Sequence, residues 1–179
     1  MALKSTIYKA DCQIVDIDRG YYQPHSLTIA LHPSETEERM MVRLLAFVIN
    51  AHEHLQFSKG LSSEDEPDIW QKNLTDDIEL WIDVGMPDEK RIRKASNRAE
   101  KVIIYSYGGR NMVWWKQIEP KLKRFTNVTV INFPKAATDE LSQLTKRAMQ
   151  LNINLQDGQI WISDNQHTAH IEPEIWLNY

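Results

Sequence analysis

One short segment constrains the fold of this chain more than any other: an apolar strand that carries a single carboxylate and leads into a basic helix. The strand covers residues 79–85, where Asp83 lies among four large apolar residues, and the helix follows from residue 87. A carboxylate on a buried strand is costly unless it is hydrogen-bonded, paired or bound to a cation. Asp83 therefore predicts either a structural ion pair or a metal site inside the fold.

Acidic and basic residues occupy separate stretches of the chain around this segment. Residues 64–89 contain ten acidic residues and one basic residue, whereas residues 90–124 contain eleven basic and two acidic residues. An acidic cluster beside a basic stretch suits a metal site next to a phosphate-binding surface. Two solvated surfaces that attract each other would give the same pattern. The pI near 5.9 is low for a protein that binds DNA without sequence preference.

The hydrophobic periodicity predicts an α/β (α+β) fold: one compact domain over residues 1–179, with a mixed β-sheet core and flanking helices. A hairpin of residues 5–15 and 26–31 comes first. A buried helix then begins at a Ser34–Glu37 capping box and runs to about Phe57. Later strands are expected near 69–70 and at 78–84, 102–105 and 128–133, helices at 87–100, 114–124 and 139–150, a hairpin turn at Asp157-Gly158, and a further turn at Asp164-Asn165.

Composition places the protein in the cytoplasm. Cys12 is the single cysteine among 179 residues, so no internal disulfide can form, which fits a reducing compartment. Residues 1–6 have no apolar core, so we expect no secretion. No run approaches the roughly 18 apolar residues of a membrane span, and we expect no membrane partner.

Several stretches of the sequence resemble the YaeQ family of bacterial proteins, over essentially the whole chain. The resemblance implies a compact variant of the PD-(D/E)XK nuclease fold, in proteins without an established biochemical activity. The stretches that carry it are Leu27–Thr36, Glu38–Arg43, Gly60–Ser62, Glu66–Trp70, Trp81–Gly85 and Arg91–Ala95.

The resemblance implies a site as well as a fold. Pro67-Asp68 matches the PD element, Asp83 matches the (D/E) position, and Glu35 matches an accessory carboxylate on the first helix. Asp68, Asp83 and Glu35 would together hold Mg²⁺ or Mn²⁺, hard cations that prefer oxygen ligands. Residue 85, where the motif has lysine, is glycine.

Basic residues of the following helix complete the expected site. Lys90 and Lys94 lie one turn apart on one helix face, so either could reach back and replace the missing lysine. The residues expected to hold a nucleic-acid backbone are Arg39, Arg91, Arg93 and Arg98. The first functional hypothesis is thus a divalent-metal-dependent nuclease or phosphodiesterase.

Each element also has a structural interpretation. Asp83 could be bonded to backbone amides or to Arg39, and the basic helix could be a plain solvated face. Trp114-Trp115 could stack on bases, although core packing or a partner surface is at least as consistent with the pattern. The alternative hypothesis is a non-catalytic protein that keeps the fold and binds nucleic acid or a protein partner, which the glycine at residue 85 favours.

Overall fold

The structure, a computed structural model, describes residues 4–59 and 65–179. Contacts divide the chain into two compact units that alternate in the sequence. The first unit comprises Met1–Ile49 and Pro134–Pro173, and the second comprises Asn50–Phe133 and Glu174–Tyr179. Each unit is built around its own sheet, which divides the chain more finely than the single-domain prediction.

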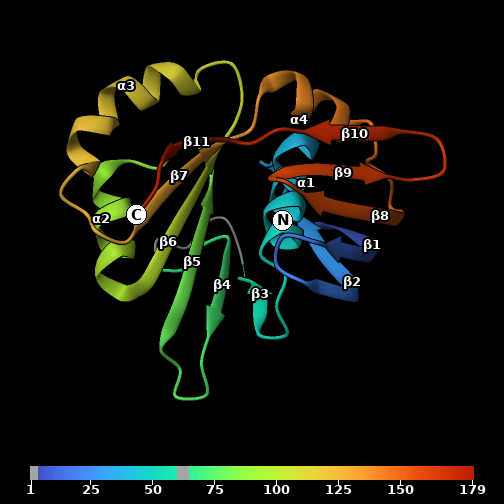
Figure 1. Ribbon diagram of the computed structural model, residues 1–179, viewed down its shortest axis with the longest axis horizontal. Helices are drawn as coiled ribbons and strands as arrows, with labels where there is room; N and C mark the ends of the chain where they lie inside the picture. Colours follow the sequence, from blue (N-terminus) through green and yellow to red (C-terminus); the bar gives the residue numbers. More distant parts are fainter. Residues whose placement is uncertain (1–3, 60–64) are drawn as a thin grey trace. The chain divides into compact units, whose positions relative to one another are not determined.

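The first unit contains a five-stranded sheet in the order β10-β9-β8-β1-β2 (Figure 1). Side chains of β1 alternate between buried and exposed positions, as expected for a strand covered on one face only. The pairing is antiparallel except between β1 and β8, which run parallel, so the sheet is mixed. Its strands are β1 (Thr6–Asp16), β2 (Tyr21–Leu31), β8 (Ala148–Gln156), β9 (Gln159–Ser163) and β10 (Thr168–Ile171).

Two helices, α1 (Glu37–Ile49) and α4 (Lys135–Ser142), belong to this unit. The backbone N–H of Arg39 donates to Thr36 Oγ1, so Thr36 caps α1. Ser34 instead bonds the His32 ring, and the expected Ser34–Glu37 capping box does not form. All residues from Met40 to Val48 are buried, which confirms that this helix is central.

The second unit contains a six-stranded sheet in the order β11-β7-β6-β5-β4-β3. The central strands β5, β6 and β7 run parallel, and the outer pairs are antiparallel, so this sheet is also mixed. Its strands are β3 (Leu55–Phe57), β4 (Ile69–Lys72), β5 (Ile78–Val84), β6 (Ala99–Ser106), β7 (Val128–Asn132) and β11 (Glu174–Leu177).

Helices α2 (Glu89–Arg98) and α3 (Asn111–Leu122) connect the parallel strands and pack on one face of this sheet (Figure 1). Only Ile92 and Ala95 of α2 are buried, so the helix buries a narrow stripe and exposes a wide charged surface. Trp81 of β5 and Trp115 of α3 lie in the same apolar core. The sheet therefore fixes α2 directly beside the end of β5 that carries Asp83.

The mixed α/β character, the first hairpin and the strand at 78–84 are confirmed. The long helix to Phe57 is wrong: α1 ends at Ile49, and Leu55–Phe57 form β3. The helix at 139–150 is also wrong, because α4 ends at Ser142 and β8 begins at Ala148. Strand β11 was not expected. Residues 60–62 of the family pattern lie outside the described residues.

Within residues 4–59 and 65–179, no helix is both long and apolar enough to cross a membrane.

Candidate functional site

Asp83 forms a buried two-point ion pair with Arg91. The carboxylate, on β5, is 3% exposed, and Arg91 lies on the first turn of α2. Arg91 Nε donates to Asp83 Oδ2 at 2.9 Å and Nη2 donates to Oδ1 at 3.0 Å. Both carboxylate oxygens therefore accept a guanidinium N–H, in the geometry that makes arginine pairs strong. Asp83 therefore takes part in an ion pair with Arg91, whereas the structural interpretation of the sequence suggested backbone amides or Arg39 as its partner.

The surroundings of Asp83 shift its proton equilibrium. Burial raises the pKa of the Asp83 carboxyl group, the Arg91 guanidinium opposes this change, and the Asp68 carboxylate raises the pKa further. Asp68 and Asp83 are thus close enough to interact electrostatically, as the sequence predicts. The charge of Asp83 depends on Arg91.

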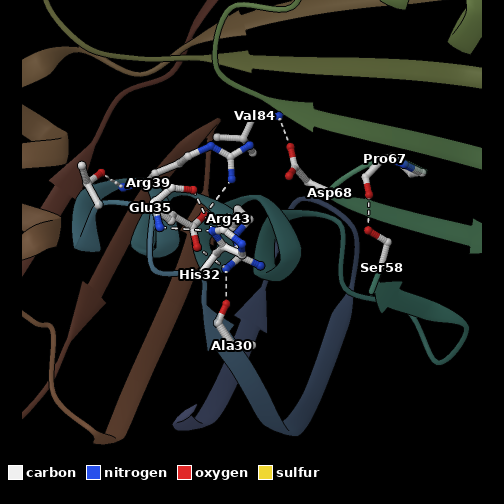
Figure 2. A network of polar contacts seen from close by, with 11 residues as sticks. Ala30, His32, Glu35, Arg39, Arg43, Ser58, Pro67, Asp68 and Val84 are labelled. Atoms are coloured by element: carbon white, nitrogen blue, oxygen red, sulfur yellow. Dashed lines mark hydrogen bonds and ion pairs between the residues drawn. The ribbon is translucent and has the colours of Figure 1, made fainter. Parts of the chain in front are cut away.

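Asp68 is tied to the end of β5 by hydrogen bonds at two points. Its Oδ2 accepts the Val84 backbone N–H at 2.8 Å (Figure 2). Its own backbone N–H donates to the Ile82 carbonyl at 3.1 Å. Ser58 Oγ also donates to the carbonyl of Pro67, which fixes the preceding residue. The Pro67-Asp68 element is a structured segment against β5, and one carboxylate oxygen of Asp68 holds the backbone there.

Gly85 directly follows the last residue of β5. Its backbone N–H donates to the Tyr105 carbonyl at 2.8 Å, and its φ angle is +116°. Asp88 follows as the cap of α2, because its Oδ1 accepts the Arg91 N–H at 2.8 Å. The turn from β5 to α2 is therefore defined by backbone geometry and a helix cap.

The basic residues of α2 are largely engaged by acidic neighbours. Lys94 Nζ pairs with the Asp65 carboxylate, and Arg98 donates to the Asp65 carbonyl. Arg93 Nη1 lies 3.5 Å from Glu89 Oε2 on the same helix. The sorted charges of the sequence thus meet across this surface. Arg98 also lies over the Trp81 ring, 5.3 Å from its centroid.

A pocket of about 280 Å³ opens on this surface and is lined by Asp88, Lys90, Arg91 and Lys94. Lys90 forms no ion pair with any residue that the structure describes. Asp88 already accepts a backbone N–H as a cap, so the three cations dominate the lining. The pocket brings together three of the predicted site residues and suits an anionic group.

Glu35 and Arg39 belong to the first unit, where they form an ion-pair network with Arg43. Glu35 lies in the turn before α1 rather than on the helix. It accepts from Arg39 Nη1 at 2.7 Å, from Arg43 Nε at 2.8 Å and from Arg43 Nη2 at 2.8 Å (Figure 2). The sequence analysis assigned Arg39 to a nucleic-acid backbone, but in the structure it pairs with Glu35, and Arg43, one turn further along the helix, was missed.

The carboxylates as arranged do not fit a bound divalent metal. Glu35 is held by two arginines and Asp83 by one, so a cation would have to displace guanidinium groups. Across the described parts of the chain, no three or more His, Cys, Asp or Glu side chains group in a way that could hold a metal ion. The arrangement suits charge compensation and anion binding better than metal coordination.

Comparison with known proteins gives a consistent match over the whole chain. A family model described as YaeQ protein matches residues 1–173. Two curated relatives, each described as an uncharacterized protein YaeQ, align over 177 residues and 98% of both chains. The protein from Salmonella typhi is 45% identical, and that from Escherichia coli K12 is 43% identical.

Two solved structures share the fold. The crystal structure of YaeQ protein from Xanthomonas axonopodis pv. citri superposes with a TM-score of 0.94 at 43% identity, covering 98% of this chain and 99% of that chain. The YaeQ protein structure from Pseudomonas syringae gives 0.93 at 35% identity, covering 98% and 97%. The architecture described above is therefore common to these proteins.

Proposed function

Because this chain belongs to the YaeQ family, and the related proteins above are described without an activity, we propose a function from its own geometry: it binds nucleic acid at the α2 pocket without metal-dependent cleavage. The observation that carries this proposal is the lining of the pocket. Lys90, Arg91 and Lys94 converge there from two successive turns of one helix. A backbone phosphate carries the charge and the acceptor oxygens that such a set of donors binds.

The ion pairs that these cations already form are compatible with phosphate binding. Lys94 is 41% exposed and its partner Asp65 is 79% exposed, and exchanging such a surface pair for a phosphate costs little. Arg91 is different, because its guanidinium holds a buried carboxylate. We assign phosphate contact mainly to Lys90 and Lys94, with Arg91 as the fixed base of the pocket.

Cleavage is disfavoured by the same ion pair. A PD-(D/E)XK site needs its carboxylates free for a metal and a lysine beside it. Here Arg91 occupies both oxygens of Asp83, Asp68 bonds the Val84 backbone, and residue 85 has no side chain. These contacts favour a protein that binds without hydrolysing.

We propose as a second candidate a phosphodiesterase of the PD-(D/E)XK type that uses Mg²⁺ or Mn²⁺. Its support is the approach of Asp68 and Asp83, which is close enough to raise the pKa of Asp83. Asp68 and Asp83 would be its carboxylates, with Lys94 or Lys90 near the phosphate. It requires Arg91 to leave Asp83, so it ranks second.

Binding and cleavage assays on matched variants distinguish the two candidates. Fluorescence anisotropy with labelled oligonucleotides is expected to show binding that weakens at least tenfold in the double variant Lys90→Gln, Lys94→Gln. The slope of log K against log salt should fall by about 1.4 for a single strand or about 1.8 for a duplex, because two phosphate contacts are lost. The double variant Lys121→Gln, Lys123→Gln makes the same charge change at exposed positions at the C-terminal end of α3 and should bind as the wild type does.

The same oligonucleotides, incubated with Mg²⁺ or Mn²⁺, should remain intact. Equal loss of binding in both double variants would refute the α2 pocket as the binding surface. Products that form with metal in the wild type and disappear in Asp83→Asn would instead establish the second candidate.

A further inference from the structure

We propose that Asp65 and Glu66 are an internal competitor of the nucleic acid: they hold cations of α2 in the free protein and are displaced when a phosphate backbone binds. This inference rests on the proposed function and names a regulation of the same site. We call these two residues the acidic strap. They come directly before Pro67-Asp68 and belong, like α2, to the second unit.

The acidic strap engages three basic residues of α2. Arg91 Nη2 donates to the Glu66 carbonyl at 3.0 Å. Lys94 Nζ pairs with the Asp65 carboxylate, and Arg98 Nη1 donates to the Asp65 carbonyl. The three basic residues are three and four positions apart in the sequence, so they lie on one side of the helix. One short segment therefore occupies the row of cations that a phosphate backbone would follow.

The chain after the acidic strap is fixed, whereas the strap itself begins at an exposed residue. Pro67 is buried, and its carbonyl accepts from Ser58 Oγ (Figure 2). Asp68 Oδ2 accepts the Val84 backbone N–H at the end of β5. The side chain of Asp65, by contrast, is 79% exposed. The strap can therefore leave α2 while the segment that follows it stays attached to the sheet.

The acidic strap satisfies the α2 cations only in part. Two of its three contacts use neutral carbonyl oxygens, which bind a guanidinium less strongly than a charged oxygen does. Arg98 forms no ion pair with any residue that the structure describes. The third contact joins Lys94 to Asp65 in an exposed pair, and such pairs contribute little. A phosphate backbone offers charged oxygens to all three cations, so it is the stronger ligand.

The charge of Asp65 makes the strap a competitor at neutral pH. The hydrogen bond and the charge of Lys94 lower the pKa of the Asp65 carboxyl group, so this group stays ionised. A phosphate that binds Lys94 must first replace Asp65, and the apparent affinity falls with the fraction of protein in which the pair is closed. Neutralising Asp65 frees Lys94 without changing any group that contacts the ligand.

Fluorescence anisotropy with a labelled oligothymidylate and a labelled duplex of equal length tests the strap. We expect Asp65→Asn to bind about three- to fivefold more tightly than the wild type, the upper range for one exposed ion pair. Asp76→Asn is the matched control and should bind as the wild type does. Asp76 is also an exposed acid, with Oδ1 3.5 Å from Lys72 Nζ, and it lies in the β4–β5 turn.

A double-mutant cycle separates the contact from a general effect of charge. In the Lys94→Gln background, Asp65→Asn should no longer raise the affinity, because the pair is already absent. An increase that persists in this background, or an equal increase in Asp76→Asn, would overturn the strap.

The outcomes also separate the strap from the proposed function. If the Lys90→Gln, Lys94→Gln variant loses affinity but Asp65→Asn binds no more tightly than the wild type, the strap alone is overturned. If the wild type binds neither probe, binding by Asp65→Asn that disappears in the Asp65→Asn, Lys94→Gln variant would support both proposals. Absence of binding by the wild type and by Asp65→Asn would overturn both.

Discussion

Replacing Arg91 with methionine removes the guanidinium that compensates Asp83 while keeping most of the apolar stem of the side chain. Asp83 is 3% exposed, and both of its carboxylate oxygens accept from Arg91. Removing one partner of a buried pair typically costs about 3–5 kcal/mol, because an uncompensated charge remains. The Arg91 side chain is 28% exposed, so water can enter the vacated position, and we expect about 3 kcal/mol.

The free-energy cost of Arg91→Met should depend on pH. Burial already raises the pKa of Asp83 in the folded chain, so the folded state keeps a proton at pH values where the unfolded chain has released it. The stabilisation from this proton is fully present below the pKa of the carboxyl group in the unfolded chain. It is lost as the pH rises through the pKa of that group in the folded chain. Without the opposing guanidinium the folded pKa rises further. The penalty of Arg91→Met is therefore smaller at pH 5 than at pH 7.5.

Urea unfolding followed by circular dichroism measures both effects. Arg93→Met is the control, because Arg93 is 48% exposed and 3.5 Å from Glu89, and such a pair contributes about 1 kcal/mol at most. Equal losses in the two variants, or a penalty for Arg91→Met that does not change between pH 5 and 7.5, would refute the assignment of Arg91 as the counter-ion of a buried carboxylate.

Two further predictions concern the first unit. Glu35→Gln removes a fully buried charge that accepts from Arg39 and Arg43. It should lower the free energy of unfolding by about 3 kcal/mol. Urea denaturation measures this loss, and Glu53→Gln, at an exposed position, is the control. Burial raises the pKa of the Cys12 thiol to about 12. At pH 8.5 a thiol reagent should therefore modify the native protein only as fast as the protein unfolds. Rapid modification of the folded protein would contradict this burial.

Local pattern was enough to predict the elements that carry the candidate site. The strand at 78–84 has an unbroken run of large side chains, and the helix after it begins at an Asp88 cap, so both were predicted closely. The hairpin turn at Asp157-Gly158 was predicted correctly, and it joins β8 to β9. The start of β8 was misassigned because Asp139 to Gln150 contains enough helix-forming residues to hide the change at Ala148. The strict alternation of Met149, Leu151, Ile153 and Leu155 was a signal that could have found it.

The pairing of charges was harder to predict than their presence. The sequence indicated that Asp83 needs a cation and that two oppositely charged stretches attract each other. The turn at Gly85 sets the direction of α2 and so decides which cation contacts Asp83. That cation is Arg91, eight residues further along the chain, which the sequence analysis had assigned to nucleic-acid binding. Likewise Glu35 accepts from Arg39 and Arg43 because it lies in the turn before α1, whereas the sequence analysis placed it on the helix.

The backbone at Gly85 also limits how this protein can evolve. A Cβ added there would meet no atom within 4 Å, so there is room for a side chain, but at φ +116° the chain adopts a conformation that L-amino acids rarely accept. A single codon change that places lysine at residue 85 would therefore have to rebuild the turn, and with it the start of α2 and the position of Arg91. The ion pair that holds Asp83 thus depends on a glycine two residues away, so a substitution at residue 85 is expected to weaken that pair.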